Sequence, residues 1–221
     1  MANGADQLTF RYFNESDFKP VMQFIINNFI RTEPLAVSIG FQEADAWTIT
    51  ADTVREALPD GYCCGYENPN KEIVAVRICQ PVNRPTTAER CDESNNECQN
   101  LSKAARTISL VLDTLEKQIW HKVDPSITRL FTIHIICTNN DYRRKGLCYK
   151  LMNMDIEKQK SDGIQGMYTE ATAFNSQRLF HKMGCTVLAQ VDYSSVKDES
   201  GKALIGTVTG TDCAQLFYKK Y

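Results

Sequence analysis

Apolar residues near the start of the chain change from the spacing of a strand to the spacing of a helix. Residues 8–12 alternate apolar and polar side chains, which predicts a first strand. A stripe at helical spacing follows, formed by Phe18, Val21, Met22, Ile25 and Phe29. Because Pro34 disfavours a helical conformation at Glu33, we expect this first helix to end within residues 32–35.

The middle of the chain contains two further helical patterns and a pair of short apolar runs. Helices are expected at about residues 43–57 and 101–119, and the second has a clear apolar face. Between them, residues 62–67 and 72–80 are predicted to be strands joined by a turn at 68–70. The following stretch, 81–96, is polar and contains two prolines, so we predict a surface loop there.

The C-terminal half alternates between the two kinds of pattern. Strands are predicted at 130–138, 167–172, 186–193 and 213–219. Helices are predicted at 146–160 and 175–183, closed by Gly163 and Gly184. The first of these helices is expected to face the core with Leu147, Leu151, Met152 and Met154.

The order of the predicted elements sets the fold class. Strands alternate with helices only in part, so the fold class is α/β, of the α+β kind, with a mixed rather than a fully parallel sheet. A chain of 221 residues that is 43% hydrophobic by count can bury a sizeable core. We therefore expect residues 1–221 to form a single domain.

Charge and cysteine content limit the expected partners. The chain has 25 Lys and Arg against 27 Asp and Glu, so no general electrostatic attraction draws it to nucleic acid or to a membrane surface. Its first ten residues do not form a secretory signal. Nine cysteines, an odd number, are interpreted as reduced thiols. We expect a cytoplasmic monomer with neither a nucleic-acid partner nor a membrane partner.

Three basic residues and a glycine stand between a predicted buried strand and a helix. They are Arg143, Arg144, Lys145 and Gly146. The first N–H groups of a helix have no partner within it, and with the helix dipole they favour an anion such as a diphosphate. Gly146 has no Cβ, so its backbone can approach a ligand closely. The alternative is an ordinary basic helix start on a solvated surface.

The run Arg143-Arg144-Lys145-Gly146-Leu147-Cys148 resembles the acetyl-CoA signature of the GNAT superfamily, Arg/Gln-x-x-Gly-x-Gly/Ala. Cys148 departs from the small last residue of that signature. The resemblance implies the GNAT fold, a mixed and mostly antiparallel sheet with splayed central strands and flanking helices. It also implies acetyl-CoA as co-substrate and makes all six residues candidates for binding it.

A second segment, 167–185, is similar to the strand and helix that follow the signature in this superfamily. Two strands splay apart there in the family, and the pantetheine arm inserts between them. The resemblance implies that the backbone of Ile136, Cys137 and Thr138 pairs with the pantetheine amides. It also implies that Asn175 and Ser176 lie near the thioester, with Asn175 contacting the coenzyme.

The triplet Glu33-Pro34-Leu35 is similar to the Glu-Pro-Leu motif of insect-type arylalkylamine N-acetyltransferases, in which the Glu is the catalytic base. Amines of this class are mostly ammonium ions at neutral pH, so a base must remove a proton before the amine attacks a thioester. Partial burial would raise the pKa of Glu33 and make it a better base. In the alternative interpretation, Glu33 is only a surface residue before a proline.

The remaining catalytic groups follow less directly from the residues. Many GNAT enzymes place a Tyr acid four residues before the glycine that ends this helix, where the present chain has Phe180. Ser176 is a candidate substitute, although a serine near a helix start is often a cap, and water could also protonate the thiolate. A backbone N–H within residues 137–139 is expected to stabilise the oxyanion.

Other signals in the chain predict no further chemistry. Cys63-Cys64 and Cys91-x6-Cys98 lack the paired spacing of structural zinc sites, so no metal is expected. His134 lies between two isoleucines of a predicted strand and is interpreted as a half-buried strand residue.

These observations favour an enzyme that moves acetyl directly from acetyl-CoA to the primary amine of a small arylalkylamine, such as a biogenic monoamine. Glu33 and Ser176 are the catalytic candidates. Two alternatives stay open. The acceptor could be a polyamine, a diamine or a protein amine, or the chain could bind coenzyme A without turnover.

Overall fold

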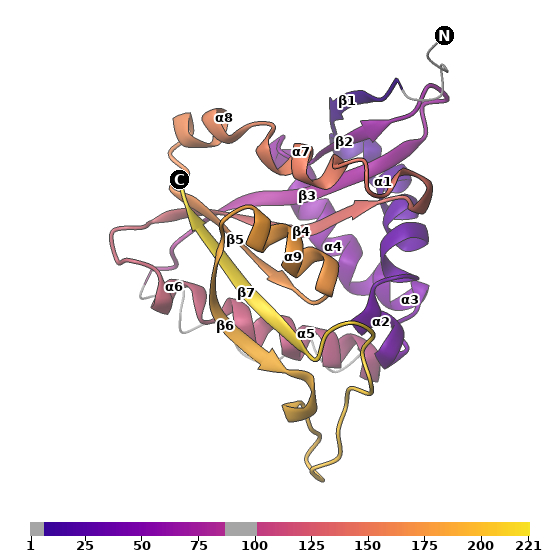
Figure 1. Cartoon of the computed structure of the whole chain (residues 1–221), viewed down its shortest axis with the longest axis vertical. Coiled ribbons are helices and arrows are strands. Elements are labelled where there is room, and N and C mark those ends of the chain that lie inside the picture. The colour runs from indigo at the N-terminus through magenta and orange to yellow at the C-terminus, as the bar shows by residue number, and fades with distance from the viewer. Residues whose placement is uncertain (1–6, 87–100) are drawn as a thin grey trace.

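The computed structural model describes residues 7–86 and 101–221, which form a seven-stranded sheet with helices on both faces (Figure 1). The strands are β1 (Thr9–Tyr12), β2 (Cys64–Glu67), β3 (Ile73–Asn83), β4 (Arg129–Thr138), β5 (Gly166–Ala171), β6 (Thr186–Asp192) and β7 (Cys213–Lys220). They lie in the order β1-β2-β3-β4-β5-β7-β6, and every neighbouring pair is antiparallel except β4 with β5. The expected mixed, mostly antiparallel sheet is confirmed.

Helices cover the sheet on both sides. The longer ones are α1 (Phe18–Ile25), α4 (Ala51–Ala57), α5 (Lys103–Glu116), α7 (Leu147–Asn153) and α9 (Phe174–Lys182). The shorter ones are α2 (Pro34–Ile39), α3 (Glu43–Asp45), α6 (Ile119–Lys122) and α8 (Ile156–Ser161), with π-helical turns at Ile26–Ile30 and Ala46–Thr50. In Figure 1, α7 and α9 lie in front of the sheet, whereas α1, α4 and α5 lie behind it. Within the described ranges, no helix is long and apolar enough to cross a membrane.

The predicted apolar faces form the cores between these layers. Val21, Met22 and Ile25 of α1 are fully excluded from solvent and pack in one cluster with Ile78 of β3. On the other face, Phe180 of α9 packs in a separate cluster with side chains of β4 and β7. Helices therefore cover both faces of the central strands, and polar side chains on these strands are expected to be buried.

Pro34 begins a helix that the sequence pattern did not predict. The preceding helical segment ends at Ile30, and the backbone of Glu33 is extended (φ −71°, ψ 124°), as expected before a proline. Pro34 then takes the first position of α2, where a missing N–H removes no bond within the helix. The expectation that residues 32–35 only end a helix was therefore incomplete.

The prediction of one continuous helix over 146–160 is wrong. The chain leaves the helix after Asn153 and starts α8 at Ile156, because Asp155 turns inward. Its carboxylate forms an ion pair of 2.6 Å with Arg77, which is completely buried and needs a charged partner. Met154 is consequently exposed instead of buried. The core positions that the pattern predicted correctly are Leu147, Leu151 and Met152.

β3 extends further than its sequence pattern predicts. The strand continues to Asn83, so the first residues of the predicted 81–96 loop belong to the sheet. Pro81 is tolerated because β2 pairs with β3 only as far as Arg77, which leaves no ladder bond for the missing N–H. Residues 87–96 of the predicted loop lie outside the described residues.

Candidate active site

β4 and β5 are paired over only two positions. Residues Phe131–Thr132 of β4 are matched with Met167–Tyr168 of β5, and the ladder then stops. β4 nevertheless continues to Thr138, while a bulge opposite Ile78–Cys79 of β3 bends it. The two central strands therefore diverge, as the resemblance to the GNAT fold implied.

The edge of β4 that faces β5 carries backbone groups without a strand partner. On its other edge β4 stays paired with β3, and the N–H of Asn139 donates to the carbonyl of Val74 at 2.9 Å. Successive backbone groups of a strand point to opposite sides, so those of Ile136 and Thr138 point toward β5. Of the three predicted pantetheine-binding residues, Cys137 therefore directs its backbone groups toward β3.

The predicted phosphate cradle forms a recess at the start of α7. Asn139 caps the short 3-10 turn that follows β4, and the backbone then takes left-handed conformations at Arg144 (φ 63°) and Gly146 (φ 75°). A non-glycine residue in that conformation is strained, and such strain gathers at ligand sites. The recess has a volume of about 730 Å³ and is lined by Asn140, Asp141, Arg143, Arg144 and Asn175.

Asn175 brings the second predicted segment to the first. It lies in the first turn of α9, yet it lines the same recess as Arg143 and Arg144. The first N–H groups of α7 have no partner within that helix, and the two guanidinium groups add positive charge beside them. The structure thus places Asn175, which was expected near the thioester, beside Arg143 and Arg144 at the recess.

The other predicted coenzyme-binding residues of this segment make contacts within the protein. Leu147 points into the core and is buried, and the ammonium of Lys145 lies 4.9 Å from the centre of the Tyr142 ring. Cys148 replaces the small residue of the signature, and its Sγ lies 3.0 Å from the hydroxyl of Thr138. This contact joins the first turn of α7 to the end of β4, so the cysteine holds the cradle against the diverging strand.

Glu33 is a buried cap rather than a surface residue. It is only 5% exposed, and its Oε2 accepts a hydrogen bond of 2.6 Å from the amide of Ala36 at the start of α2. Burial raises the pKa of the Glu33 carboxyl above its usual value. Hydrogen bonds from the Ala36 and Leu35 amides and from the Thr172 hydroxyl partly offset that rise. A buried carboxylate with a raised pKa is suited to accept a proton.

Thr172 and Tyr193 belong to this site although no sequence argument singled them out. The Thr172 hydroxyl donates to Oε1 of Glu33 at 3.0 Å, and the Tyr193 hydroxyl donates to the Thr172 carbonyl at 2.6 Å. Burial and the negative charge of Glu33 raise the pKa of the Tyr193 phenol. The position of Thr172 one residue beyond β5 was the available signal, because strand ends often carry functional side chains.

Ser176 and Phe180 lie on the α9 side of the site. The Ser176 hydroxyl donates to the carbonyl of Ala173 at 2.8 Å within the first turn of α9. Phe180 is buried, and its ring centre lies 5.7 Å from that of Phe217. The position that carries a Tyr acid in many GNAT enzymes is thus part of an apolar core here.

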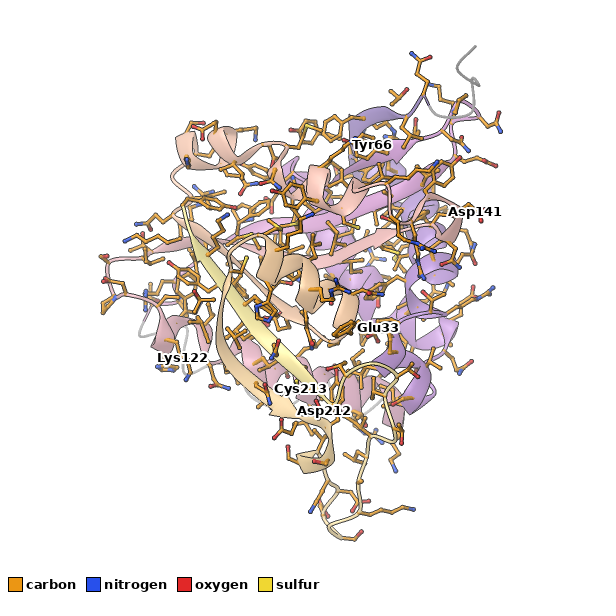
Figure 2. The ribbon with its side chains drawn as sticks, viewed as in Figure 1. Glu33, Tyr66, Lys122, Asp141, Asp212 and Cys213 are labelled. Atoms are coloured by element: carbon orange, nitrogen blue, oxygen red, sulfur yellow. The ribbon has the colours of Figure 1, made fainter. Side chains whose placement is uncertain are left out.

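One short connection relates the base candidate to the recess. Residues 172–175 link β5 to α9, with Thr172 bound to Glu33 at one end and Asn175 lining the recess at the other. Figure 2 labels Glu33, which caps α2, and Asp141, which lines the recess. No group of three or more His, Cys, Asp or Glu that could hold a metal occurs among the described residues.

Comparisons of the whole chain give likeness in structure but none in sequence. No protein-family model matches it, and neither does any curated protein. The crystal structure of arylalkylamine N-acetyltransferase 2 from Aedes aegypti is 20% identical, with a TM-score of 0.84 over 97% of this chain and 99% of that one. The polyamine N-acetyltransferase of Drosophila melanogaster is 18% identical, with a TM-score of 0.79 over 97% and 100%. Arabidopsis thaliana NAA60 in complex with acetyl-CoA is 13% identical, with a TM-score of 0.52 over 97% and 100%.

Likeness at these identities shows the fold. The chain has the fold of the GNAT acetyltransferases over nearly its whole length, as its signature-like segment implied. The roles of the individual site residues stay predictions.

Proposed function

We propose that this protein transfers an acetyl group from acetyl-CoA to the primary amine of a small molecule, and that the acceptor is an arylalkylamine. The observation that carries the proposal is the 172–175 connection, which places a buried carboxylate and a basic recess at the two ends of one short segment. A coenzyme with a diphosphate in the recess would extend its pantetheine arm toward that carboxylate.

The coenzyme is bound through its charged end and its amide arm. Arg143 and Arg144 bind the diphosphate together with the N–H groups at the start of α7. The pantetheine amides then pair with the open edge of β4 at the backbone groups of Ile136 and at the carbonyl of Thr138, which leaves the Thr138 N–H for the oxyanion.

Glu33 acts as the base on the acceptor side. It takes a proton from the ammonium group, directly or through a water, and the free amine attacks the thioester carbon. Typical general-base assistance contributes about 10²–10⁴-fold in rate. The hydrogen bond from Thr172 holds the carboxylate of Glu33 in place through the reaction.

The tetrahedral intermediate then collapses. Its oxyanion accepts a hydrogen bond from a backbone N–H of β4, and Thr138 is the best placed because its amide points toward β5. When the C–S bond breaks, the thiolate of coenzyme A takes a proton from water or from Ser176, and the amide product is released. A thiol is a good leaving group, so the buried Phe180 is compatible with this step.

The likeness to an insect arylalkylamine N-acetyltransferase supports the choice of acceptor, as does the Glu33-Pro34-Leu35 triplet. The likeness to a polyamine N-acetyltransferase supports the alternative of a diamine or polyamine acceptor.

The test is release of free thiol from acetyl-CoA by the purified chain against phenylethylamines, putrescine, spermidine and a peptide amine. Turnover with arylalkylamines in preference to the others is expected. Turnover with only polyamines or peptides would reject the arylalkylamine acceptor, and coenzyme binding without any turnover would indicate a non-catalytic module.

A further inference from the structure

Two polar atoms in the middle of the sheet are sealed from solvent and lack a partner. They are Nε2 of His134 in β4 and Oε1 of Glu170 in β5, and neither makes a hydrogen bond with the described residues. A buried polar atom without a partner costs about 1–3 kcal/mol. Such atoms are rare in folded proteins, and two of them on neighbouring strands indicate a site that is completed by something else.

The two residues lie at the same level of the sheet, one on each of the diverging strands β4 and β5. Thr132 and Tyr168 form the last matched pair of β4 and β5. Each strand reaches its unpartnered residue two positions further on, at His134 and Glu170. His134 is also the extra residue of the β4 bulge, because its neighbours Ile133 and Ile135 are matched with adjacent residues of β3.

Both residues keep some exposed surface although they lie on the two innermost strands, while the two unpartnered atoms themselves are covered. His134 and Glu170 are each half-buried, whereas Thr132 and Tyr168 are buried. The Tyr168 hydroxyl donates to Glu116 of α5 at 2.9 Å, which shows that this face of β5 is turned toward α5. Glu170 lies on the same face, since side chains two apart on a strand share a face.

The pair carries no net charge near neutral pH. Burial lowers the pKa of His134 to about 4, so its imidazole is neutral. Burial and the carboxylates of Glu116 and Asp113 raise the pKa of Glu170 to about 8, so its carboxyl keeps a proton. Together they offer hydrogen-bond donors and acceptors without a charge, which suits a hydroxyl group better than an ammonium ion.

Glu170 is connected to the base candidate through Thr172. Thr172 follows Glu170 by two residues and bonds to Glu33. Two residues of strand span about 7 Å. This spacing from Glu170 to Thr172, the residue that bonds to Glu33, is comparable to the span between the amine and the ring hydroxyl of a hydroxyphenylethylamine.

We propose that His134 and Glu170 form a subsite that binds the ring hydroxyl of an arylalkylamine whose amino group lies at Glu33. This inference rests on the proposed acetyl transfer and specifies its acceptor as a hydroxylated arylalkylamine. Both unpartnered atoms obtain a hydrogen bond when the acceptor binds.

The experiment compares 4-hydroxyphenylethylamine with phenylethylamine, which differ only in that hydroxyl. The unmodified chain should favour the hydroxylated amine by about 10-fold to 100-fold in kcat/KM, because the analogue leaves buried polar groups unpaired. Glu170→Leu and His134→Leu should each remove most of this preference, chiefly through KM, and retain turnover of phenylethylamine. Glu170→Gln, which imitates the protonated carboxyl, should keep the preference. Glu157→Gln is the control, because Glu157 is an exposed carboxylate of α8 that pairs with Lys160 and does not contact the subsite.

Several outcomes would overturn the subsite. Equal kcat/KM for the two amines in an active parent enzyme would refute it and leave acetyl transfer intact. An unchanged preference in both leucine variants would also refute it. A preference for putrescine that Glu170→Gln abolishes would identify a cation site instead. Absence of turnover with every amine would refute the proposed function itself.

Discussion

The hydroxyl of Thr172 donates a hydrogen bond of 3.0 Å to the carboxylate of Glu33 and so joins two residues that lie 139 positions apart in the chain. Glu33 caps α2, while Thr172 follows the last residue of β5. The contact ties the N-terminal helices to the strand that diverges from β4. The carboxylate is therefore fixed by both halves of the chain and not by its own helix alone.

Replacement of Glu33 by Gln should separate its chemical role from its structural one. The amide oxygen of Gln can still accept the bond from Ala36 and its NH2 can donate to the Thr172 hydroxyl, but the side chain cannot take a proton. We expect kcat/KM to fall by about 10²–10⁴-fold with little change in the free energy of unfolding. Thiol-release kinetics and chemical denaturation measure the two effects. Glu43→Gln is the control, because that exposed carboxylate only pairs with Arg31; parental activity in Glu33→Gln would remove Glu33 from the mechanism.

The pH dependence of the reaction should reflect the environment of Glu33. Burial raises the pKa of this carboxyl, and the Thr172 hydroxyl lowers it by stabilising the charged form. As a base must be ionised, kcat/KM should fall as pH drops through a pKa above the usual glutamate value. Thr172→Val removes a bond to the ionised form and should move that acidic limb to higher pH. A limb that moves to lower pH in this variant would contradict the assignment.

The absence of a Cβ at Gly146 should favour coenzyme binding, and this effect can be measured separately from backbone strain. The left-handed φ of 75° at Gly146 disfavours any residue with a Cβ, and Gly146→Ala should cost about 1–2 kcal/mol. Gly163 has a similar φ of 78° and also has open space where a Cβ would lie, but it follows α8. Both alanine variants should lose similar stability, whereas only Gly146→Ala should raise KM for acetyl-CoA, by about 10-fold. Equal KM values in the two variants would reject the cradle.

The ion pair between Arg77 and Asp155 should dominate the stability of its region. Arg77 is completely buried, and Asp155 bonds to it through both oxygens at 2.9 and 2.6 Å. Asp155→Ala leaves a buried guanidinium without its partner, which should cost about 3–5 kcal/mol in the free energy of unfolding. Glu157→Ala breaks only an exposed pair with Lys160 and should cost less than about 1 kcal/mol. Urea denaturation compares the two, and equal losses would mean that the buried pair is not the cause.

Glu170 should make the fold less stable as the pH rises. Its pKa is raised to about 8, so between roughly pH 4.3 and pH 8 the folded protein keeps a proton that the unfolded chain releases. Raising the pH through this window favours unfolding, by at most about 1.4 kcal/mol per pH unit. Glu170→Gln should therefore gain stability relative to the parent from pH 5 to pH 8 in denaturation curves. Glu157→Gln, an exposed carboxylate, should follow the parent throughout, and a Glu170→Gln advantage that shrinks with pH would contradict the assignment.

Local patterns predicted the elements of this fold well, because periodicity and turn residues act over a few positions. The buried strand before Arg143 and the helix closed by Gly184 both follow from such patterns. The failures have long-range causes. Asp155 breaks a helix because it pairs with Arg77, 78 positions earlier, and no local pattern contains that partner.

In the candidate site too, local motifs predicted some residues, whereas others depend on contacts between distant parts of the chain. Arg143, Gly146 and Asn175 could be singled out because each belongs to a short motif, and the structure places all three at the start of α7 or beside it. Thr172 could not, because its importance depends on a contact with Glu33 across the molecule. The burial of Glu33 likewise depends on the layers that pack around α2, which its own neighbours in sequence do not reveal.

Because β4 and β5 are paired over only two positions, the sheet consists of two antiparallel parts with few hydrogen bonds between them. One part contains β1 to β4, and the other contains β5 to β7. A molecule that binds between β4 and β5 and forms hydrogen bonds with both strands would connect the two parts. Its binding should then stabilise the whole sheet and slow amide hydrogen exchange even in strands remote from the bound molecule.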